Sequence, residues 1–248
     1  MSNQIELVKM INIHKWFGTV HALNGVDFTV NRGEVVGLVG DNGAGKSTLI
    51  KILSGVYPPD MGEIYFEGRK VRFRSPADAR KLGIETVYQD QALAPNLSIV
   101  RNIFMGREIT ASFGFLDLKK MSGEARKAIE TLGLRVRSPL EPVAILSGGE
   151  RQGVAIARAL YFKAKLVILD EPTAALSIKE TQKVLDFVRL LKKEGVSVIF
   201  ITHNLYHVYE VADRFVVLFR GMKVADVLKE QTSIEELTCY ITTGKAAA

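Results

Sequence analysis

The spacing of apolar residues changes along the chain from strand-like to helix-like and back. Residues 4–30 carry short alternating apolar runs that break at 17–18 and at 31–33. A period of two is typical of half-buried strands, so this segment predicts antiparallel strands joined by tight turns. A second hairpin is expected over 62–73, with its turn at 67–68.

Four apolar runs, at 34–39, 166–169, 196–201 and 215–219, have no alternation. Such runs are typical of strands that are buried on both faces of a sheet. Segments with helical spacing separate them, the first of which is expected to form a helix over 47–54. Strands that alternate with helices predict a mainly parallel sheet.

In the segment 93–160 helical spacing dominates, and an amphipathic helix is expected over 122–132. The segment interrupts the series of strands, so it predicts a helical subdomain, at about 91–160, inserted into a core made of 1–90 and 161–248. We therefore expect one α/β domain that spans the whole chain and carries an antiparallel β subdomain near its N-terminus.

Composition fits a globular protein that binds an anion. The chain has 248 residues, of which 47% are hydrophobic and 24% charged, and its net charge is +6. A positive balance suits anionic partners. The basic residues are dispersed, however, and their one dense group, at 69–74, alternates with apolar residues as on the wet face of a strand. Nucleic acid is therefore not an expected partner.

Three features of the sequence favour the cytoplasm. The single cysteine, Cys239, excludes an intrachain disulfide and fits a reducing compartment. No stretch reaches the roughly 18 apolar residues of a membrane-spanning helix. The N-terminal residues also lack the apolar centre of a signal peptide.

The octapeptide GDNGAGKS, residues 40–47, follows a predicted strand and opens a predicted helix. Its glycines let successive backbone N–H groups turn toward a phosphate, and the helix N-terminus adds positive potential. Lys46 can reach the outer phosphates, and the Ser47 hydroxyl can hold Mg²⁺. Because a strand precedes it and a helix follows, nucleotide binding is favoured over an incidental glycine turn. The expected contacts are Gly40, Asp41, Asn42, Gly43, Ala44, Gly45, Lys46, Ser47 and Thr48.

The run LVILDE, residues 166–171, ends a buried strand on two carboxylates. Parallel α/β sheets bind ligands at the carboxyl ends of their strands. Asp170 can there complete a Mg²⁺ site, and Glu171 can act as the general base toward an attacking water. Alone, the pair could be ordinary strand-end carboxylates. The phosphate loop in the same chain favours the catalytic interpretation.

Two further polar residues follow predicted strands. His203 comes after the apolar run at 196–201, and Gln89 lies where a strand gives way to the helical segment. The histidine could contact a γ-phosphate or the attacking water, or it could be a hydrogen-bonded turn residue. The glutamine could bind Mg²⁺ or water, or it could be an ordinary surface residue.

A second glycine-rich segment, LSGGERQ at 146–152, begins about a hundred residues after the first. Ser147, Gly148 and Gly149 offer a hydroxyl and N–H groups at a predicted helix start, and Glu150 follows. This arrangement is an anion site that has no lysine of its own.

The order and spacing of these motifs resemble the ATP-binding subunits of ABC transporters, and the resemblance covers nearly the whole chain. Residues 40–47 resemble the Walker A loop, LVILDE the Walker B strand with its catalytic glutamate, and LSGGERQ the signature motif. By position, Gln89 resembles the Q-loop glutamine, His203 the switch histidine, and Phe17 the aromatic residue that stacks on adenine. The implied fold is a P-loop NTPase core of the RecA type.

The resemblance implies why a second anion site is present. In the family two ATP-binding domains pair head to tail, and each signature motif caps the ATP held by the Walker A loop of its partner. ATP and Mg²⁺ are then the expected cofactors. ATP would close the dimer, and hydrolysis would open it by removing the γ-phosphate contacts.

The wording of the segment 73–109, together with that of DEPTAALS at 170–177, is similar to that of bacterial monosaccharide importers of the ribose, xylose and fructose type. This implies an integral-membrane permease as partner, a sugar-binding protein that meets the chain only indirectly, and a position on the inner face of the membrane. The alternatives are an ABC exporter ATPase or an importer for another small solute. Apolar residues of 93–105 are expected mostly in the core, with a minority in a groove for the permease.

Two features depart from the importer pattern. Many such importers fuse two ATP-binding domains, whereas this sequence has one, so a homodimer or pairing with a second ATP-binding subunit is expected. The aspartate that usually follows the Walker B segment is replaced by Ser177. That replacement puts in doubt how the two active sites communicate.

Competing classes lack part of this set of residues. A DNA-repair ABC ATPase would usually carry a long coiled coil or a zinc-binding insert. A translation-type ABC factor would need two domains, and a small P-loop kinase would lack LSGGERQ. An inactive ATPase fold would be expected to lack Glu171 or His203. The importer ATPase is therefore favoured.

Overall fold

The computed structural model describes residues 5–87, 93–134 and 136–246. The strands are β1 (Glu6–Phe17), β2 (Val20–Asn31), β3 (Val35–Val39), β4 (Met61–Phe66), β5 (Arg69–Val71), β6 (Ile84–Val87), β7 (Leu166–Asp170), β8 (Ser197–Ile201), β9 (Arg214–Phe219) and β10 (Met222–Leu228). The α-helices are α1 (Lys46–Leu53), α2 (Pro76–Leu82), α3 (Ile99–Phe104), α4 (Leu118–Thr131), α5 (Gly148–Tyr161), α6 (Ile178–Lys193), α7 (Leu205–Val211) and α8 (Ile234–Thr243).

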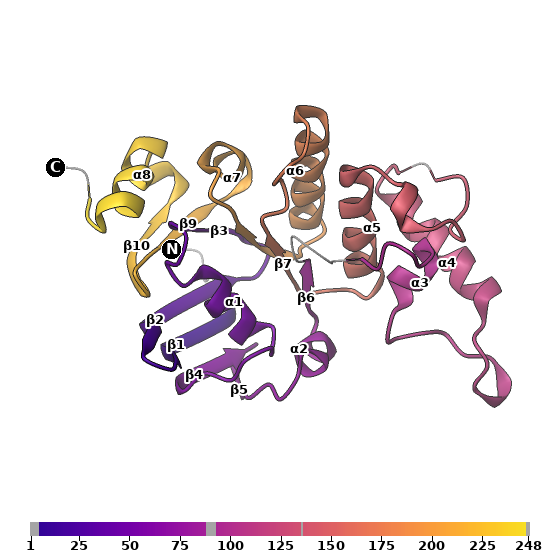
Figure 1. The fold of residues 1–248 in the computed structure, drawn as a ribbon, viewed down its shortest axis with the longest axis horizontal. Helices are drawn as coiled ribbons and strands as arrows, with labels where there is room; N and C mark the ends of the chain where they lie inside the picture. The colour runs from indigo at the N-terminus through magenta and orange to yellow at the C-terminus, as the bar shows by residue number, and fades with distance from the viewer. Residues whose placement is uncertain (1–4, 88–92, 135, 247–248) are drawn as a thin grey trace.

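Within the described residues, the strands form two sheets (Figure 1). One has four antiparallel strands in the order β2-β1-β4-β5, and the other has six in the order β10-β9-β3-β8-β7-β6. Neighbours from β9 to β6 are parallel, and β10 adds an antiparallel edge. The predicted α/β architecture, with a mainly parallel sheet and an antiparallel β segment near the N-terminus, is confirmed.

The six-stranded sheet separates two apolar cores. On β3, Val35 and Val39 belong to one core, and Val36 and Leu38 belong to the other. Helices α3 to α8 contribute side chains to the first core, whereas α1 and the four-stranded sheet close the second. Because both faces of the sheet are covered, its central strands are apolar throughout rather than alternating.

The second hairpin forms as predicted. Strand β5 folds back on β4, with Phe66 opposite Arg69. Between them, Glu67 has φ 50° and Gly68 has φ 74°. Two consecutive positive φ angles are typical of the tight turns whose twist matches that of paired strands. A glycine at the second position relieves the strain of this conformation.

The segment between β6 and β7 is helical, as expected, and α3, α4 and α5 pack together at one end of the molecule (Figure 1). The predicted start of α4 at Ser122 was wrong. The helix begins four residues earlier because Asp117 caps it, its carboxylate accepting a hydrogen bond from the backbone N–H of Lys120 at 2.9 Å. A carboxylate at this position satisfies a free N–H group and complements the helix dipole.

A buried ion-pair cluster ties β9 to its neighbours. Arg214 donates to Glu34 at 2.7 Å, to Asp226 on β10 at 2.5 Å and to the carbonyl of Thr29 on β2 at 2.8 Å. Burial works against the charge, yet the bond to Glu34 and the two carboxylate charges outweigh it and keep the pKa of Arg214 above its ordinary value. The cluster therefore fixes the edge of the sheet that lies next to the phosphate loop.

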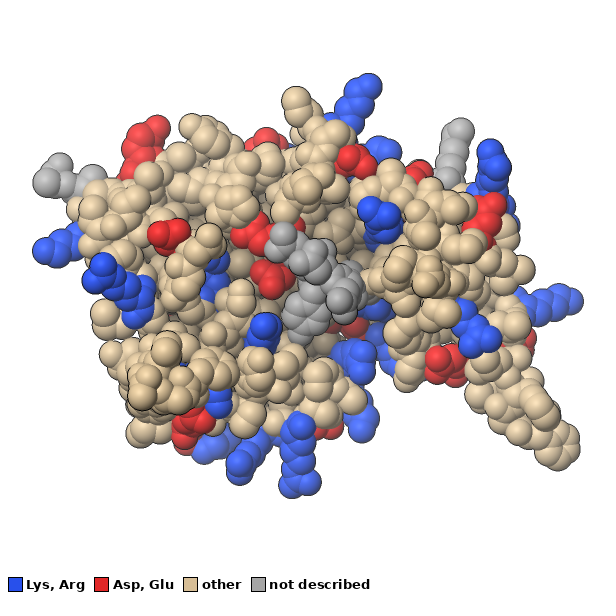
Figure 2. Space-filling model, viewed as in Figure 1, with Lys and Arg blue, Asp and Glu red and all other residues tan. Residues whose placement is uncertain are grey.

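One face of the molecule carries both positive and negative side chains (Figure 2). On the face shown in Figure 2, lysines and arginines are scattered among acidic residues instead of forming one patch. Of the helices in the described ranges, not one combines the length and the apolar character needed to cross a membrane.

Candidate active site

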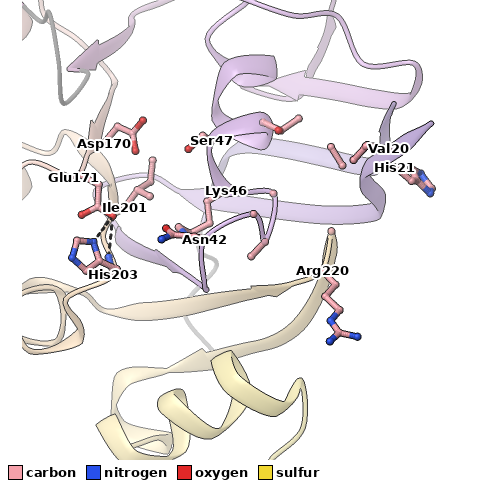
Figure 3. Close-up of a pocket in the computed structure, with 16 residues that line it drawn as sticks. Val20, His21, Asn42, Lys46, Ser47, Asp170, Glu171, Ile201, His203 and Arg220 are labelled. Carbon is pink, nitrogen blue, oxygen red and sulfur yellow. Dashed lines mark hydrogen bonds and ion pairs between the residues drawn. The ribbon is translucent and has the colours of Figure 1, made fainter. Parts of the chain in front are cut away.

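A cavity of about 790 Å³ lies between the phosphate loop and the carboxyl ends of β7 and β8 (Figure 3). Ligands of parallel α/β sheets bind at this edge. The phosphate loop and the predicted carboxylates, which are far apart in the sequence, share this cavity. Its lining comprises Val20, His21, Ala22, Asn42, Gly43, Ala44, Gly45, Lys46, Ser47, Thr48, Asp170, Glu171, Ile201, His203, Arg220 and Gly221.

Lys46 lies at the centre of this site and is only 7% exposed. Its Nζ donates to the carbonyl oxygens of Gly40, at 2.7 Å, and of Asp41, at 3.0 Å. Burial lowers the pKa of Lys46, and the nearby carboxylates of Glu171, Asp41 and Asp170 oppose that effect. An ammonium group that has lost part of its hydration gains from contact with an anionic ligand.

Two glycines of the phosphate loop have no substitute. Gly40 has φ 152°, and a Cβ there would lie 2.4 Å from the carbonyl oxygen of Leu218 on β9. Gly45 has φ 104°, and a Cβ there would lie 2.8 Å from the carbonyl oxygen of Ala22. The loop therefore turns tightly because it lies directly against the backbone of two strands.

Asp170 ends β7 and lies across the cavity from Ser47 (Figure 3). Burial, followed by the charge of Glu171, raises the pKa of Asp170, whereas Lys51 and Lys46 act in the opposite direction. A buried carboxylate with a raised pKa is a group that gains from a cation. The oxygens of Asp170 and Ser47 are of the kind that Mg²⁺ prefers.

Glu171 is held by three hydrogen-bond donors. The backbone N–H of His203 and its ring Nδ1 each lie 3.0 Å from Oε1, and the hydroxyl of Thr202 lies 3.1 Å from Oε2. Its own backbone has φ 49°, a left-handed conformation that costs a non-glycine residue about 1 kcal/mol. The strand end and the following loop thus fix the direction of this carboxylate.

The predicted adenine contact, Phe17, lies outside the lining of the cavity. Its ring is 43% exposed and packs edge-on against Tyr57, with centroids 5.4 Å apart. Val20 and His21 on β2 line the cavity instead, together with Arg220 from the turn between β9 and β10. The sequence did not predict these three residues. Val20 and His21 could have been indicated by their position close after Phe17, but no signal in the sequence indicated Arg220. Gln89 falls outside the described residues.

The second glycine-rich segment, here called the signature loop (146–152), forms the start of α5. Ser147 caps this helix, since its Oγ accepts from the N–H of Glu150 at 3.3 Å, and its own N–H donates to the Glu150 carboxylate at 2.9 Å. Gly149 donates its N–H to Glu180 on α6 at 3.3 Å. None of these residues belongs to the described lining of the cavity.

A phosphate loop between strand and helix, with strand-end carboxylates across one cavity, defines the P-loop nucleoside triphosphatases. Within that class the chain belongs to the ABC transporter family, whose model matches residues 23–174. It is an ATP-binding cassette, the subunit type that hydrolyses ATP to power transport.

Similar proteins support this assignment. The xylose/arabinose import ATP-binding protein XylG of Sulfolobus acidocaldarius is 54% identical over 96% of this chain and 94% of its own length. The fructose import ATP-binding protein FrcA of Rhizobium meliloti is 44% identical over 93% of this chain and 92% of its own. The ribose import ATP-binding protein RbsA 1 of Rubrobacter xylanophilus is 50% identical, and the chain spans 44% of its length.

Solved structures share the fold. The ADP conformation of MJ1267, an ATP-binding cassette of an ABC transporter, has a TM-score of 0.81 and 29% identity, covering 96% of this chain and 95% of that one. A dimeric post-hydrolysis state of the cassette MJ0796, bound to ADP and Pi, has a TM-score of 0.75 and 26% identity over 90% of this chain and 98% of that one.

Proposed function

We propose that this chain hydrolyses Mg²⁺-bound ATP and thereby drives the import of a monosaccharide through a membrane permease. The observation that carries the proposal is the shared cavity, in which Lys46 and Ser47 face Asp170 and Glu171. A cation and a hydroxyl on one side and carboxylates on the other suit a triphosphate and a divalent cation. The volume of about 790 Å³ is adequate for such a ligand.

In this proposal the phosphates lie along residues 40–48. Above Gly43 nothing lies within 4 Å of the position that a Cβ would take, so the loop is open to a ligand there. Lys46 exchanges its two carbonyl contacts for phosphate oxygens, and the N-terminus of α1 adds positive potential. Ser47, Asp170 and Gln89 would hold Mg²⁺, which would supply positive charge to neutralise the phosphates.

Glu171 is the proposed general base. Its carboxylate takes a proton from a water that attacks the γ-phosphate, and Lys46 stabilises the negative charge that develops. His203 holds the carboxylate through its backbone N–H and its ring. At the other end of the cavity, Val20 and His21 lie around the adenine ring of ATP. Phe17 joins them when its ring turns away from Tyr57.

The signature loop acts in trans in this proposal. Ser147, Gly148, Gly149 and Glu150 are absent from the lining of their own cavity and stand at the start of a helix, where an anion is stabilised. The likeness to the dimeric cassette MJ0796 supports pairing of two cassettes. The partner is a second copy of this chain or another ATP-binding subunit.

The transported solute follows from the similar proteins. Relatives at 54%, 44% and 50% identity are named for import of xylose and arabinose, of fructose and of ribose. We therefore assign the chain to a monosaccharide importer, with a permease in the membrane and a sugar-binding protein as an indirect partner. In this proposal the chain works at the cytoplasmic face of the membrane.

Sugar uptake tests the transport part of the proposal. Cells that contain the chain and its permease should accumulate labelled xylose, arabinose, ribose or fructose, and Glu171→Gln should abolish accumulation while lowering the ATPase rate about 10²–10⁴-fold. Loss of efflux instead would indicate an exporter, and unchanged uptake of all four sugars would indicate an importer of another solute.

The solution mass tests the trans arrangement. With Glu171→Gln, ATP should produce a dimer that ADP does not, and adding Ser147→Arg should prevent that dimer. A protein that remains monomeric with ATP would contradict pairing through the signature loop.

A further inference from the structure

Glu180 on α6 occupies the anion site of the signature loop in this structure. Its Oε1 accepts the N–H of Gly149 at 3.3 Å. The side chain also lies against the glycine itself, because a Cβ added at Gly149 would be 3.2 Å from both Cβ and Cγ of Glu180. An N–H group that the proposed function directs toward a partner's phosphate is therefore already bound to a carboxylate.

The other oxygen of Glu180 holds the carboxylate in place. Oε2 accepts from the backbone N–H of Ser177 at 3.1 Å and from its hydroxyl at 2.8 Å, while Ser177 caps α6. These bonds to Ser177, followed by those from Gly149 and Gly148, lower the pKa of Glu180. The group is therefore negatively charged at neutral pH.

A negative charge at this position conflicts with an incoming phosphate. The partner's nucleotide would bring phosphate oxygens to the N–H groups that Glu180 now accepts from, and like charges that face each other across an interface are strongly unfavourable. The carboxylate must therefore move before the N–H of Gly149 can bind the phosphate.

We propose that Glu180 is an internal stand-in for the γ-phosphate, a positioning residue that keeps the signature loop ordered in the open state and releases Gly149 when the partner's nucleotide docks. This inference rests on the proposed trans arrangement. It gives Ser177 a role of its own, because the serine holds the carboxylate that an aspartate at this position would repel.

The same contacts provide a route between the two active sites. Gln152, at the end of the signature loop, donates to the carbonyl of Pro172 at 3.2 Å, one residue after Glu171. Pro172 and Ser177 are the two ends of the segment 172–177. Within that segment, Leu176 lies against the signature loop, because a Cβ added at Gly148 would come within 2.6 Å of it. Movement of Glu180 changes its contacts with Ser177 at one end of the segment 172–177, and Gln152 joins the signature loop to the other end, directly after the proposed general base.

The dimerisation of Glu171→Gln as a function of ATP concentration tests the proposal. Adding Glu180→Gln removes the charge but keeps the shape, so the ATP concentration for half-maximal dimer should fall about tenfold. ATP binding to the monomer should not change, because Glu180 does not line the cavity. A matched control is Glu236→Gln, an equal change of charge near the cap of α8, where Ser233 accepts from the N–H of Glu236. It should leave dimerisation as it is.

The variant Ser177→Ala distinguishes the effect of the charge on Glu180 from the effect of the Ser177 hydroxyl that bonds to it. It removes the hydroxyl bond that holds the carboxylate and retains the charge on Glu180, so it should tighten the dimer less than Glu180→Gln does. A Glu180→Gln protein that dimerises no better than its parent, or a Ser177→Ala protein that tightens as much, would overturn the inference and leave the trans arrangement standing. A Glu171→Gln parent that stays monomeric with ATP would overturn both.

Discussion

Asp170 and Glu171 are adjacent in the chain but lie in different surroundings. Asp170 is desolvated at the end of β7, and burial raises its pKa, whereas Glu171 accepts three hydrogen bonds from Thr202 and His203. The first carboxylate is desolvated and therefore suits a cation. The second is directed by its neighbours and suits a base. This difference in surroundings assigns the two roles.

The raised pKa of Asp170 predicts a gain in stability on its removal. The folded state stabilises the ionised carboxylate less than the unfolded state does. The resulting loss of folding stability is complete above the raised pKa and disappears as pH falls to the ordinary pKa value of 3.8. Without nucleotide or Mg²⁺, Asp170→Asn should raise Tm by about 1–2 °C at pH 7, allowing for partial solvent screening, and by nothing near pH 4.

Asp186→Asn is the matched control for this experiment. Asp186 is exposed on α6 and pairs with Arg189 in the same helix, so its removal should leave Tm nearly unchanged at pH 7. If Asp170→Asn did not raise Tm above that of the parent at pH 7, the proposal that this site binds a cation would be contradicted.

Single residues of the site were predictable where a motif places them. Lys46, Ser47, Asp170, Glu171 and His203 come together in one cavity because each stands at the carboxyl end of a predicted strand or in the loop after it. Contacts that depend on how distant elements approach each other give no such pattern. Arg220 reaches the cavity from a turn between two strands, and nothing in the local sequence distinguishes that turn from others.

At the scale of elements, most apolar residues in and around α3 are buried and a few are exposed, as the sequence predicted. Ile99, Val100, Ile103 and Phe104 are fully buried, in agreement with the prediction that most apolar residues of 93–105 belong to the core. Leu97 and Met105, one at each side of the helix, are 42% and 41% exposed. They are the residues of this segment that remain available to a permease.

Charge at these two positions should uncouple hydrolysis from transport. Leu97→Glu and Met105→Glu should leave the ATPase rate of the isolated chain within about twofold, because surface substitutions perturb the fold little. Sugar uptake should fall about tenfold or more, since a charge would be desolvated in the permease contact. Met61→Glu, on another exposed apolar residue, in β4, is the control and should leave uptake unchanged. Normal uptake in all three variants would place the permease contact elsewhere.

Elements with a strong local signal were predicted within a few residues, and those set by tertiary contacts were not. The hairpin of β4 and β5 forms where its turn residues indicate. The start of α4 was placed too late because the apolar spacing resumes after the cap residue Asp117. The Arg214 cluster could not be foreseen, because its partners lie on three other parts of the chain.

At the scale of the whole molecule, the phosphate loop and the signature loop, the two proposed halves of a nucleotide site, do not meet within one chain. The phosphate loop opens into the cavity, while the signature loop at α5 is held by Glu150 and Glu180. In the proposed head-to-tail pair, each half would meet the complementary half of the other copy. This arrangement makes closure depend on nucleotide at the interface, and it is the central claim of the account.

The ATPase rate of a mixture of two inactive variants tests that claim most directly. Lys46→Ala disables the phosphate loop and Ser147→Arg disables the signature loop, so each variant alone has no complete site. In a mixed dimer, the intact phosphate loop of the second variant faces the intact signature loop of the first.

Half of all random encounters join the two variants, and such a pair has one of its two sites complete, so the mixture should recover at most about a quarter of the parent rate. A mixture no more active than its two components would mean that each signature loop serves its own chain or none, and would contradict the account.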